Sequence, residues 1–244
     1  MLVFSFNDSR LLTVWTGFSW RWYVALWQDR ALIEAGLLSL RIAALSATGA
    51  TVLGAMAGFA LARFGRFRGR GGLAAILAVP LVLPDAVAGL ALLLLFVALE
   101  RLVGWPAGRG AVTVTLAHMS FSLAYVAIVV QGRLAGAGVE LEEAAADLGA
   151  PPGRVFRRVT LPLMAPALVS GWLLAFTLSL DDVVIASFTT GPGATTLPMV
   201  LFSSMKLGPT PEMFALASVV LGVVLLALLG AWLARVASAE AIPR

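Results

Sequence analysis

The chain has 244 residues, of which 60% are hydrophobic and 12% charged, and its mean hydropathy is +0.97. This composition excludes an ordinary soluble domain and a disordered chain, because so apolar a polypeptide must bury its side chains or place them in lipid. The lack of cysteine and the single histidine, His118, exclude a disulfide framework and a thiolate or histidine-based metal cluster. The net charge is +4, and only one of the 17 basic residues is a lysine, Lys206. The positions of the arginines fit membrane topology better than nucleic-acid binding.

The spans can be predicted from length and charge, since a helix needs about 20 apolar residues to cross a bilayer. Charge-free stretches predict four spans, over residues 42–62, 110–132, 159–180 and 213–234. A fifth span is predicted over 71–99, with one acid, Asp85, inside it. The uncharged stretch 183–205 is broken by Gly191-Pro192-Gly193, so we expect a loop there that leads to a short surface helix over 197–206.

The arginines orient these five spans, because basic residues near span ends are retained on the cytoplasmic side. Ten arginines lie on one side, in the connectors 63–70 and 133–158 and in the C-terminal tail, against six basic residues spread over longer segments on the other. The N-terminus is therefore predicted outside and the C-terminus inside. Residues 1–6 look like the last turn of a span whose beginning is absent, and we hypothesise that the natural start lies upstream.

The connector 140–162 is charged, and its local chemistry predicts a helix, a stop and a second helix. Acids crowd its first turn, where the helix dipole favours them, and Gly149 can take the left-handed conformation that ends a helix. Pro151 or Pro152 can open the second helix, which we expect to stop at Pro162. Such a hairpin is suited to docking against a partner, and the alternative is a plain basic connector.

This connector contains, in order, Glu143-Ala144-Ala145, Gly149 and Val159-Thr160-Leu161-Pro162. Their spacing is that of the EAA loop of binding-protein-dependent ABC importer permeases, which the chain resembles. Val159 stands where isoleucine is usual. The stretches 82–85, 177–182 and 191–198 are similar to the polyamine branch, most closely to the second permease subunit of putrescine and spermidine importers. The resemblance implies an all-α integral membrane protein with the type I importer permease fold, for which the family usually has six spans against the five predicted here.

The resemblance also implies the organisation of the chain. Residues 1–30 would be an outer segment with the remnant of a first span, and 31–236 a transmembrane permease domain with the cytoplasmic coupling loop at 134–162. Residues 237–244 would be a cytoplasmic tail. The implied location is the bacterial inner membrane, with several crossings in contact with lipid and no nucleic-acid partner.

A division of labour between subunits follows from the same resemblance. A second permease subunit would complete a heterodimer, an ATPase dimer would bind in the cytoplasm, and a periplasmic polyamine-binding protein would deliver the substrate. This chain would be no enzyme and bind no cofactor, with ATP and Mg²⁺ held by the ATPase, since the only lysine is not part of a phosphate-binding loop. The residues that would couple to the ATPase are Glu143, Ala144, Ala145, Gly149, Leu161 and Pro162.

Asp85 is the one acid inside a predicted span. An ionised side chain there costs about 2.5–3.5 kcal/mol to insert, so it indicates a functional role. Pro80 and Pro84 each remove a backbone donor nearby, and freed carbonyls beside a carboxylate are typical of a cation site. The alternative is an ion pair with Arg41 or with a partner subunit.

Asp181 and Asp182 end a predicted span, where helical spacing places Thr177 with Asp181 and Ser179 with Asp182 on common faces. From the residues alone, a solvated helix end is the favoured interpretation. The polyamine resemblance instead implies a substrate path formed by Asp85, Ser179, Asp181, Asp182 and Trp22. Carboxylates would bind the ammonium groups of a diamine, and an aromatic face would add cation–π attraction.

Three other features have structural explanations. The tryptophans at 15–27 are typical of a membrane-interface belt. His118, in an otherwise charge-free span, is expected to be a hydrogen-bonded interior residue. Gly54 and Gly58 form a G-x-x-x-G pair that predicts close helix packing.

The function predicted from the sequence is therefore ATP-driven import of putrescine or a related polyamine. A permease of the same superfamily for another solute, such as an anion or a metal, is one alternative, although three acids on the path argue against an anion. An accessory membrane protein that only docks an ATPase is the other.

Overall fold

The computed structural model describes residues 2–9, 14–207, 211, 213–219 and 222, and these residues are mainly helical. In chain order the elements are the 3-10 turn η1 (Val3–Phe6), α1 (Arg21–Gln28), α2 (Arg30–Arg63), α3 (Arg70–Val82), α4 (Asp85–Val103), α5 (Ala111–Ala137), α6 (Glu140–Asp147), α7 (Pro152–Val155), the π-helical turn η2 (Phe156–Thr160), α8 (Leu161–Asp181), α9 (Val184–Thr189) and α10 (Leu197–Leu207). Two compact units divide the chain, a terminal unit of residues 1–34 and 200–244 and a central unit of residues 35–199.

Four helical stretches among the described residues are long and apolar enough to cross a membrane. They are α2, α4, α5 and the continuous stretch Pro152–Asp181, which contains α7, η2 and α8. Three predicted spans are confirmed. The span 42–62 lies within α2, 110–132 coincides with α5, and 159–180 lies within the stretch Pro152–Asp181. The predicted span 213–234 lies for the most part outside the described residues, as does the predicted tail 237–244.

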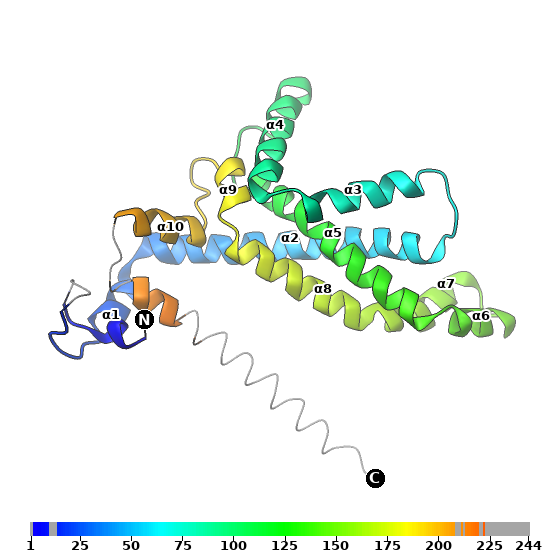
Figure 1. Cartoon of the computed structure of the whole chain (residues 1–244), viewed down its shortest axis with the longest axis horizontal. Helices are drawn as coiled ribbons and strands as arrows, with labels where there is room; N and C mark the ends of the chain where they lie inside the picture. The colour runs from blue at the N-terminus through cyan, green and yellow to red at the C-terminus, as the bar shows by residue number, and fades with distance from the viewer. Residues whose placement is uncertain (1, 10–13, 208–210, 212, 220–221, 223–244) are drawn as a thin grey trace, which may run out of the picture. The chain divides into compact units, whose positions relative to one another are not determined.

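The prediction of a single span over 71–99 is wrong, because two helices occupy these residues. α3 ends at Val82, the backbone of Leu83 and Pro84 is extended (ψ 136° and 141°), and α4 begins at Asp85. Proline lacks an N–H and disfavours helical backbone at the residue before it, so Pro84 ends α3. A carboxylate is favoured in the first turn of a helix, so Asp85 can begin α4. From this break α4 departs from the direction of the other long helices of the central unit (Figure 1).

The predicted helix stop at Pro162 is also wrong. From Pro152 the backbone stays helical through α7, η2 and α8. The five residues of η2 form a wider π-helical turn shortly before Pro162. A π-turn shifts the hydrogen bonding by one residue, and here it accommodates a proline ring that would otherwise collide with the carbonyl four residues earlier. The second helix of the predicted hairpin is therefore continuous with a candidate span.

The stretch 183–205 contains one predicted and one unexpected helix. The predicted surface helix over 197–206 is confirmed as α10. The preceding stretch, predicted to be a loop, includes the six-residue helix α9. The carboxylate of Asp182, just before α9, accepts hydrogen bonds from N–H groups in its first turn and so stabilises its start.

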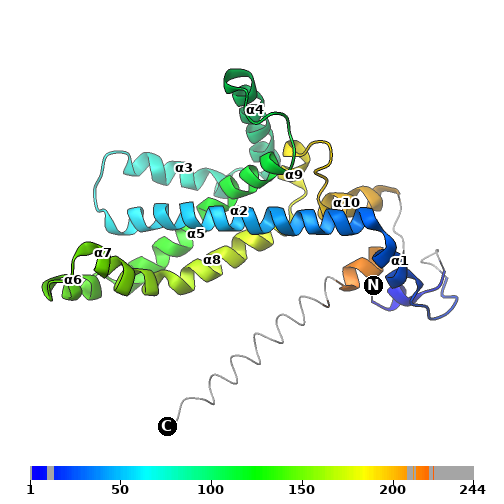
Figure 2. The ribbon, with the colours of Figure 1, turned by 180° about the vertical axis from the view of Figure 1, so that it is seen from behind.

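The core of the central unit lies where α5 packs side by side with α8, as both views of the ribbon show (Figures 1 and 2). Val126 of α5 and Ala175 of α8 are fully buried in this core. α2 approaches α5 at Gly54 and Gly58, where a Cβ added to Gly58 would lie 2.5 Å from the carbonyl oxygen of Ala127. The close helix packing predicted for this glycine pair is therefore confirmed, as a contact within the chain.

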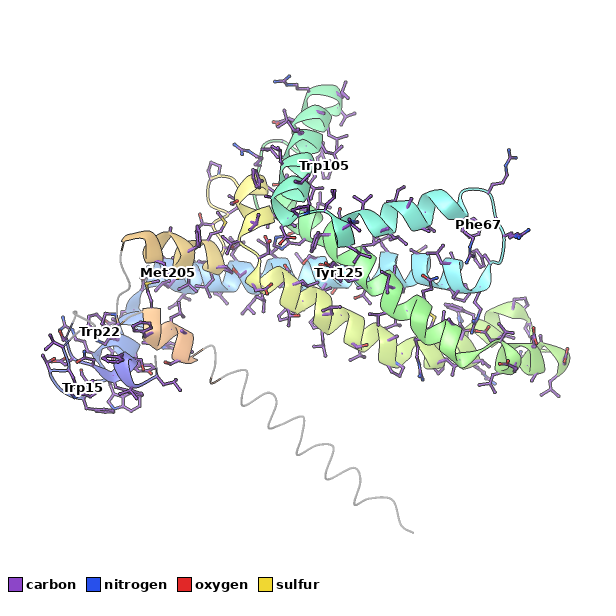
Figure 3. The ribbon with its side chains drawn as sticks, viewed as in Figure 1. Trp15, Trp22, Phe67, Trp105, Tyr125 and Met205 are labelled. Atoms are coloured by element: carbon purple, nitrogen blue, oxygen red, sulfur yellow. The ribbon has the colours of Figure 1, made fainter. Side chains whose placement is uncertain are left out.

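Aromatic side chains dominate the described part of the terminal unit, where Trp15 and Trp22 are labelled in Figure 3. Phe6 packs against Phe18, Trp20 and Tyr23 with ring centroids 5.0, 4.9 and 5.0 Å apart, respectively. Residues that precede α2 thus form an aromatic cluster of their own.

Candidate functional site

The two acids at the end of α8 stand in different environments. Asp181 is the last residue of α8 and is exposed, whereas Asp182 has extended backbone (ψ 128°) and is half-buried. The carboxylate of Asp182 accepts hydrogen bonds from the backbone N–H groups of Ile185 at 3.2 Å and Ala186 at 2.7 Å. Because the first N–H groups of a helix have no partner within it, Asp182 caps α9.

A buried polar network connects Asp182 to three helices. His118 of α5 is 3% exposed, and its Nε2 lies 3.1 Å from Oδ2 of Asp182. Its Nδ1 lies 2.6 Å from Oγ of Ser179 on α8, which in turn lies 3.2 Å from Oγ of Ser46 on α2. We call Ser46, His118, Ser179 and Asp182 the His118 network. The prediction of a hydrogen-bonded interior histidine is confirmed. Ser179 and Asp182 were predicted on one helix face, but Asp182 lies just beyond α8, and the two residues are instead brought together by their contacts with His118.

The carboxylate of Asp182 orders the hydrogen bonds of the His118 network. A carboxylate only accepts, so the neutral ring of His118 is assigned its proton on Nε2, facing Asp182, and its Nδ1 accepts from the hydroxyl of Ser179. The hydroxyl of Ser46 lies 3.2 Å from both the carbonyl of Ala43 and Oγ of Ser179. In hydrolase triads the imidazole faces the serine through Nε2 and the carboxylate through Nδ1. The opposite orientation here, with Ser179 only 6% exposed, indicates a structural network and not a nucleophile.

Asp85 reaches the same region from the first turn of α4. Its side chain is exposed, and it lies one helical turn before Gly89, where α4 contacts α9. A Cβ added to Gly89 would lie 2.6 Å from the ring of Phe188, so the two helices approach closely on this face. The alternative of an ion pair with Arg41 is not supported, because neither ion pair found among the described residues involves Asp85 or Arg41.

Three carboxylates therefore gather where α4, α8 and α9 meet. Asp181 lies close enough to Asp85 and Asp182 for their charges to act on it. Like charges so placed repel one another unless a cation or solvent screens them. The carboxylate of Asp182 already bonds to His118 and to N–H groups at the start of α9. The exposed acids, Asp85 and Asp181, are therefore the part of this cluster that is open to an incoming cation.

Trp22, the fifth residue of the predicted path, belongs to the terminal unit. It is 5% exposed, packs with Leu26 and Ala215, and donates its indole N–H to the carbonyl of Asn7 at 2.6 Å. The guanidinium of Arg21 lies 5.3 Å from the centroid of its ring, a cation–π distance. The ring thus already has a cationic neighbour within the chain, and a role for Trp22 toward substrate stays a prediction.

At the other end of α5 and α8, the predicted hairpin is present. α6 carries three acids in its first turn, Gly149 has a left-handed φ of +82°, and Pro152 begins α7. These three local predictions are confirmed. Of the predicted coupling residues, Ala145 is half-buried and the exposed ones are Glu143, Ala144, Gly149, Leu161 and Pro162.

Residues 50–240 match the family model described as "binding-protein-dependent transport system inner membrane component". The chain belongs to this family. The match includes the hairpin and every predicted path residue except Trp22. It confirms the resemblance carried by the EAA loop, and the chain is therefore a multi-pass component of an inner-membrane transport system.

Named relatives cover most of the chain. The putrescine transport system permease protein PotI of Escherichia coli K12 is 57% identical over 92% of this chain and 80% of its own length. The spermidine/putrescine transport system permease protein PotC of Haemophilus influenzae is 42% identical, over 89% of this chain and 82% of its own. PotC of Escherichia coli K12 is 41% identical, over 91% and 81%.

Solved structures show the same fold. A bacterial ABC transporter involved in import of the polysaccharide alginate superposes with a TM-score of 0.66 at 15% identity, covering 95% of this chain and 86% of that one. An amino acid ABC transporter gives 0.61 at 19% identity, covering 88% and 98%. The predicted all-α importer permease fold is thereby confirmed.

Several residues that organise the acid cluster and the hairpin were not predicted from the sequence. Ser46 has no distinguishing pattern, and its link to Ser179 follows only from packing. His118 could have been linked to the acids on one signal, because it is the only histidine and lies in a charge-free span. On the hairpin the EAA spacing directs attention to Glu143, whereas its neighbour Glu142 makes the internal contacts.

Proposed function

We propose that this chain is one of two permease subunits of an ATP-driven importer for putrescine or a related polyamine. Support comes from the pair of exposed acids, Asp85 and Asp181, together with 57% identity to a permease named for putrescine transport. Identity to permeases named for both spermidine and putrescine is lower, at 41–42%. Putrescine is accordingly the first substrate to test.

In this proposal Asp85 and Asp181 contact the ammonium groups of the substrate. A carboxylate and an ammonium group form a charge-assisted hydrogen bond, and two carboxylates near one another favour a ligand with more than one positive charge. Ser179 and Asp182 belong to the path in a different way, since the His118 network holds them in place beside Asp181. They would set the position of the acids that touch the substrate.

The hairpin would bind a cytoplasmic ATPase subunit, which would hold ATP and Mg²⁺. Glu143 and Ala144 are exposed on α6, and the hairpin borders a pocket of about 400 Å³ lined in part by Phe59 and Phe156. A projecting helix beside an apolar pocket is suited to insertion into a groove of a partner. A periplasmic binding protein would deliver the polyamine from outside, and a second permease would supply the other half of the pathway.

Uptake into living cells tests this proposal. Cells stripped of their own polyamine importers would express the chain with its second permease, ATPase and binding protein, and would be supplied with radiolabelled putrescine. The expected result is uptake that requires this chain and is competed by unlabelled spermidine but not by an anion such as molybdate. Absence of putrescine uptake, together with uptake of labelled molybdate by the same cells, would instead establish a permease for another solute.

A further inference from the structure

Arg63, the last residue of α2, lies nearly buried beside the hairpin. Its side chain is 9% exposed, and its Nε donates to Oε2 of Glu142 on α6 at 2.6 Å. Its Nη1 donates to the carbonyl of Leu134 at 3.1 Å, and its Nη2 donates to the carbonyl of Gly138. The last carbonyls of a helix have no partner within it, so this guanidinium also caps the end of α5.

Glu142 uses its second oxygen on a further element. Its Oε1 accepts a hydrogen bond at 2.7 Å from the hydroxyl of Thr160, which is 3% exposed and directly precedes α8. We call Arg63, Glu142 and Thr160 the Arg63 clasp. The clasp joins the ends of α2, α5, α6 and α8 at one place, next to the exposed Glu143.

The bonds of the clasp resist separation of these ends. Hydrogen bonds between ionised groups are short and strong, and an ion pair shielded from water is little screened by salt. The side chains of Arg63 and Glu142 are 9% and 15% exposed, so this pair is shielded. A displacement of α6 therefore moves the ends of α5 and α8 with it.

α5 and α8 extend from the clasp to the candidate substrate site. They pack side by side, and His118 of α5 bonds to Ser179 of α8 beyond this contact. The helix pair is thus tied by polar contacts at both ends, with a close-packed apolar core between them. A tightly packed pair of this kind transmits displacement instead of absorbing it.

We propose that Arg63 is a positioning residue that couples movement of the hairpin to movement of the substrate site. This inference rests on the proposed function, because it requires an ATPase that moves the hairpin. Glu142 and Thr160 take part as the partners through which Arg63 acts. Without the clasp, the ATPase would still bind and hydrolyse ATP, but less of its motion would reach the substrate site.

The test measures ATP hydrolysis and putrescine uptake in the same proteoliposomes, which contain the purified full complex. The Arg63→Gln variant should keep ATP hydrolysis while its uptake per ATP falls about fivefold or more, the lower end of typical coupling between sites. Arg66→Gln is the matched control, because Arg66 is an exposed arginine of the same connector, and it should leave the ratio unchanged. Arg63→Lys keeps the charge without the planar fork and should restore part of the ratio.

A second variant guards against misfolding. Glu142→Gln removes the ion pair but keeps an acceptor for Thr160, and should lower the same ratio. Combined with Arg63→Gln, it should add little, since the two residues act as a pair. An unchanged ratio in Arg63→Gln would overturn the proposal, and failure of both single variants to assemble would overturn it too, by making the clasp a folding element alone.

Failure of the proposed function gives a different result. If the unsubstituted complex hydrolyses ATP but takes up no polyamine, the substrate assignment fails for every variant alike. If it takes up putrescine and Arg63→Gln has the same ratio, only the role of the clasp fails.

Discussion

His118 and two backbone N–H groups at the start of α9 take up both oxygens of Asp182, whereas its neighbour Asp181 faces outward. Adjacent acids thus have different environments, one inside a polar network and the other on the surface. This difference predicts that replacing them will affect different properties of the protein.

Replacing Asp181 with asparagine should weaken transport without unfolding the chain. A hydrogen bond to a charged group contributes about 1.5–3 kcal/mol, which corresponds to a rise of roughly 10- to 150-fold in the KM for uptake. Thr177→Ala is the control on the same helix face, because among the described residues the Thr177 hydroxyl bonds only to carbonyls of its own helix, at 3.0 and 2.9 Å. Initial uptake rates over a range of putrescine concentrations would decide, and an unchanged KM for Asp181→Asn would remove this acid from the site.

Replacing His118 with alanine should instead destabilise the central unit. It removes one buried hydrogen bond each from Ser179 and Asp182, which keep only Ser46 and the N–H groups of α9 as partners, at a cost of about 1–3 kcal/mol in the free energy of unfolding. The measurement is the melting temperature of the purified complex in detergent, with Asp181→Asn as the comparison that should melt like the unsubstituted protein. Equal melting temperatures for the two variants would argue against a structural role for the network.

The helices of the central unit are held close by residues without side chains. At Gly58 a Cβ would meet the carbonyl of Ala127 at 2.5 Å and Cβ of Val130 at 3.0 Å. At Gly132, on α5, a Cβ would meet nothing within 4 Å. The two glycines therefore differ in packing although both lie in candidate spans.

Gly58→Ala should push α2 away from α5 and lower the free energy of unfolding by about 1–3 kcal/mol, the usual cost of overpacking. Gly132→Ala is the matched control and should be neutral or slightly stabilising, since alanine is the better helix former. Thermal unfolding of both variants checks this, and equal stability would show that the contact between α2 and α5 can relax.

Much of the element structure follows from local signals in the sequence. Hydropathy located α2, α5 and α8, and Gly149 with the proline at 152 defined the hairpin. The break before Asp85 was missed because continuous hydropathy outweighed Pro84, although a proline followed by an acid is itself a helix start. α9 was not predicted, because Gly191-Pro192-Gly193 made the whole stretch look like a loop, although the carboxylate of Asp182, just before it, caps its start.

The contacts that organise the candidate site are non-local, which is why spacing could not reveal them. His118 and Asp182 are separated by 64 residues, and Arg63 and Glu142 by 79. Each pair is brought together only when α5 packs beside α8 and α2. The acids and the hairpin can therefore be predicted from the sequence, but the side chains that hold them in position cannot.

On the scale of the whole molecule, the central unit has two candidate functional ends joined by one helix pair. The hairpin lies at one end of α5 and α8, and the acids Asp85 and Asp181 lie at the other. This layout suits a permease, in which ATP-driven motion at one face must alter a binding site some distance away. A chain that only docks an ATPase has no need for exposed acids at the far end.

The most direct test is ATP-driven uptake of labelled putrescine by proteoliposomes that contain the purified complex, with ATP inside and the loaded binding protein outside. We predict uptake that depends on ATP hydrolysis. We also predict that this uptake is lost when Asp85 and Asp181 are both replaced by asparagine, in a complex that still assembles. Undiminished uptake by the doubly substituted complex would contradict the assignment of these acids to the path. No putrescine uptake by the unsubstituted complex, with ATP hydrolysis intact, would contradict polyamine import itself.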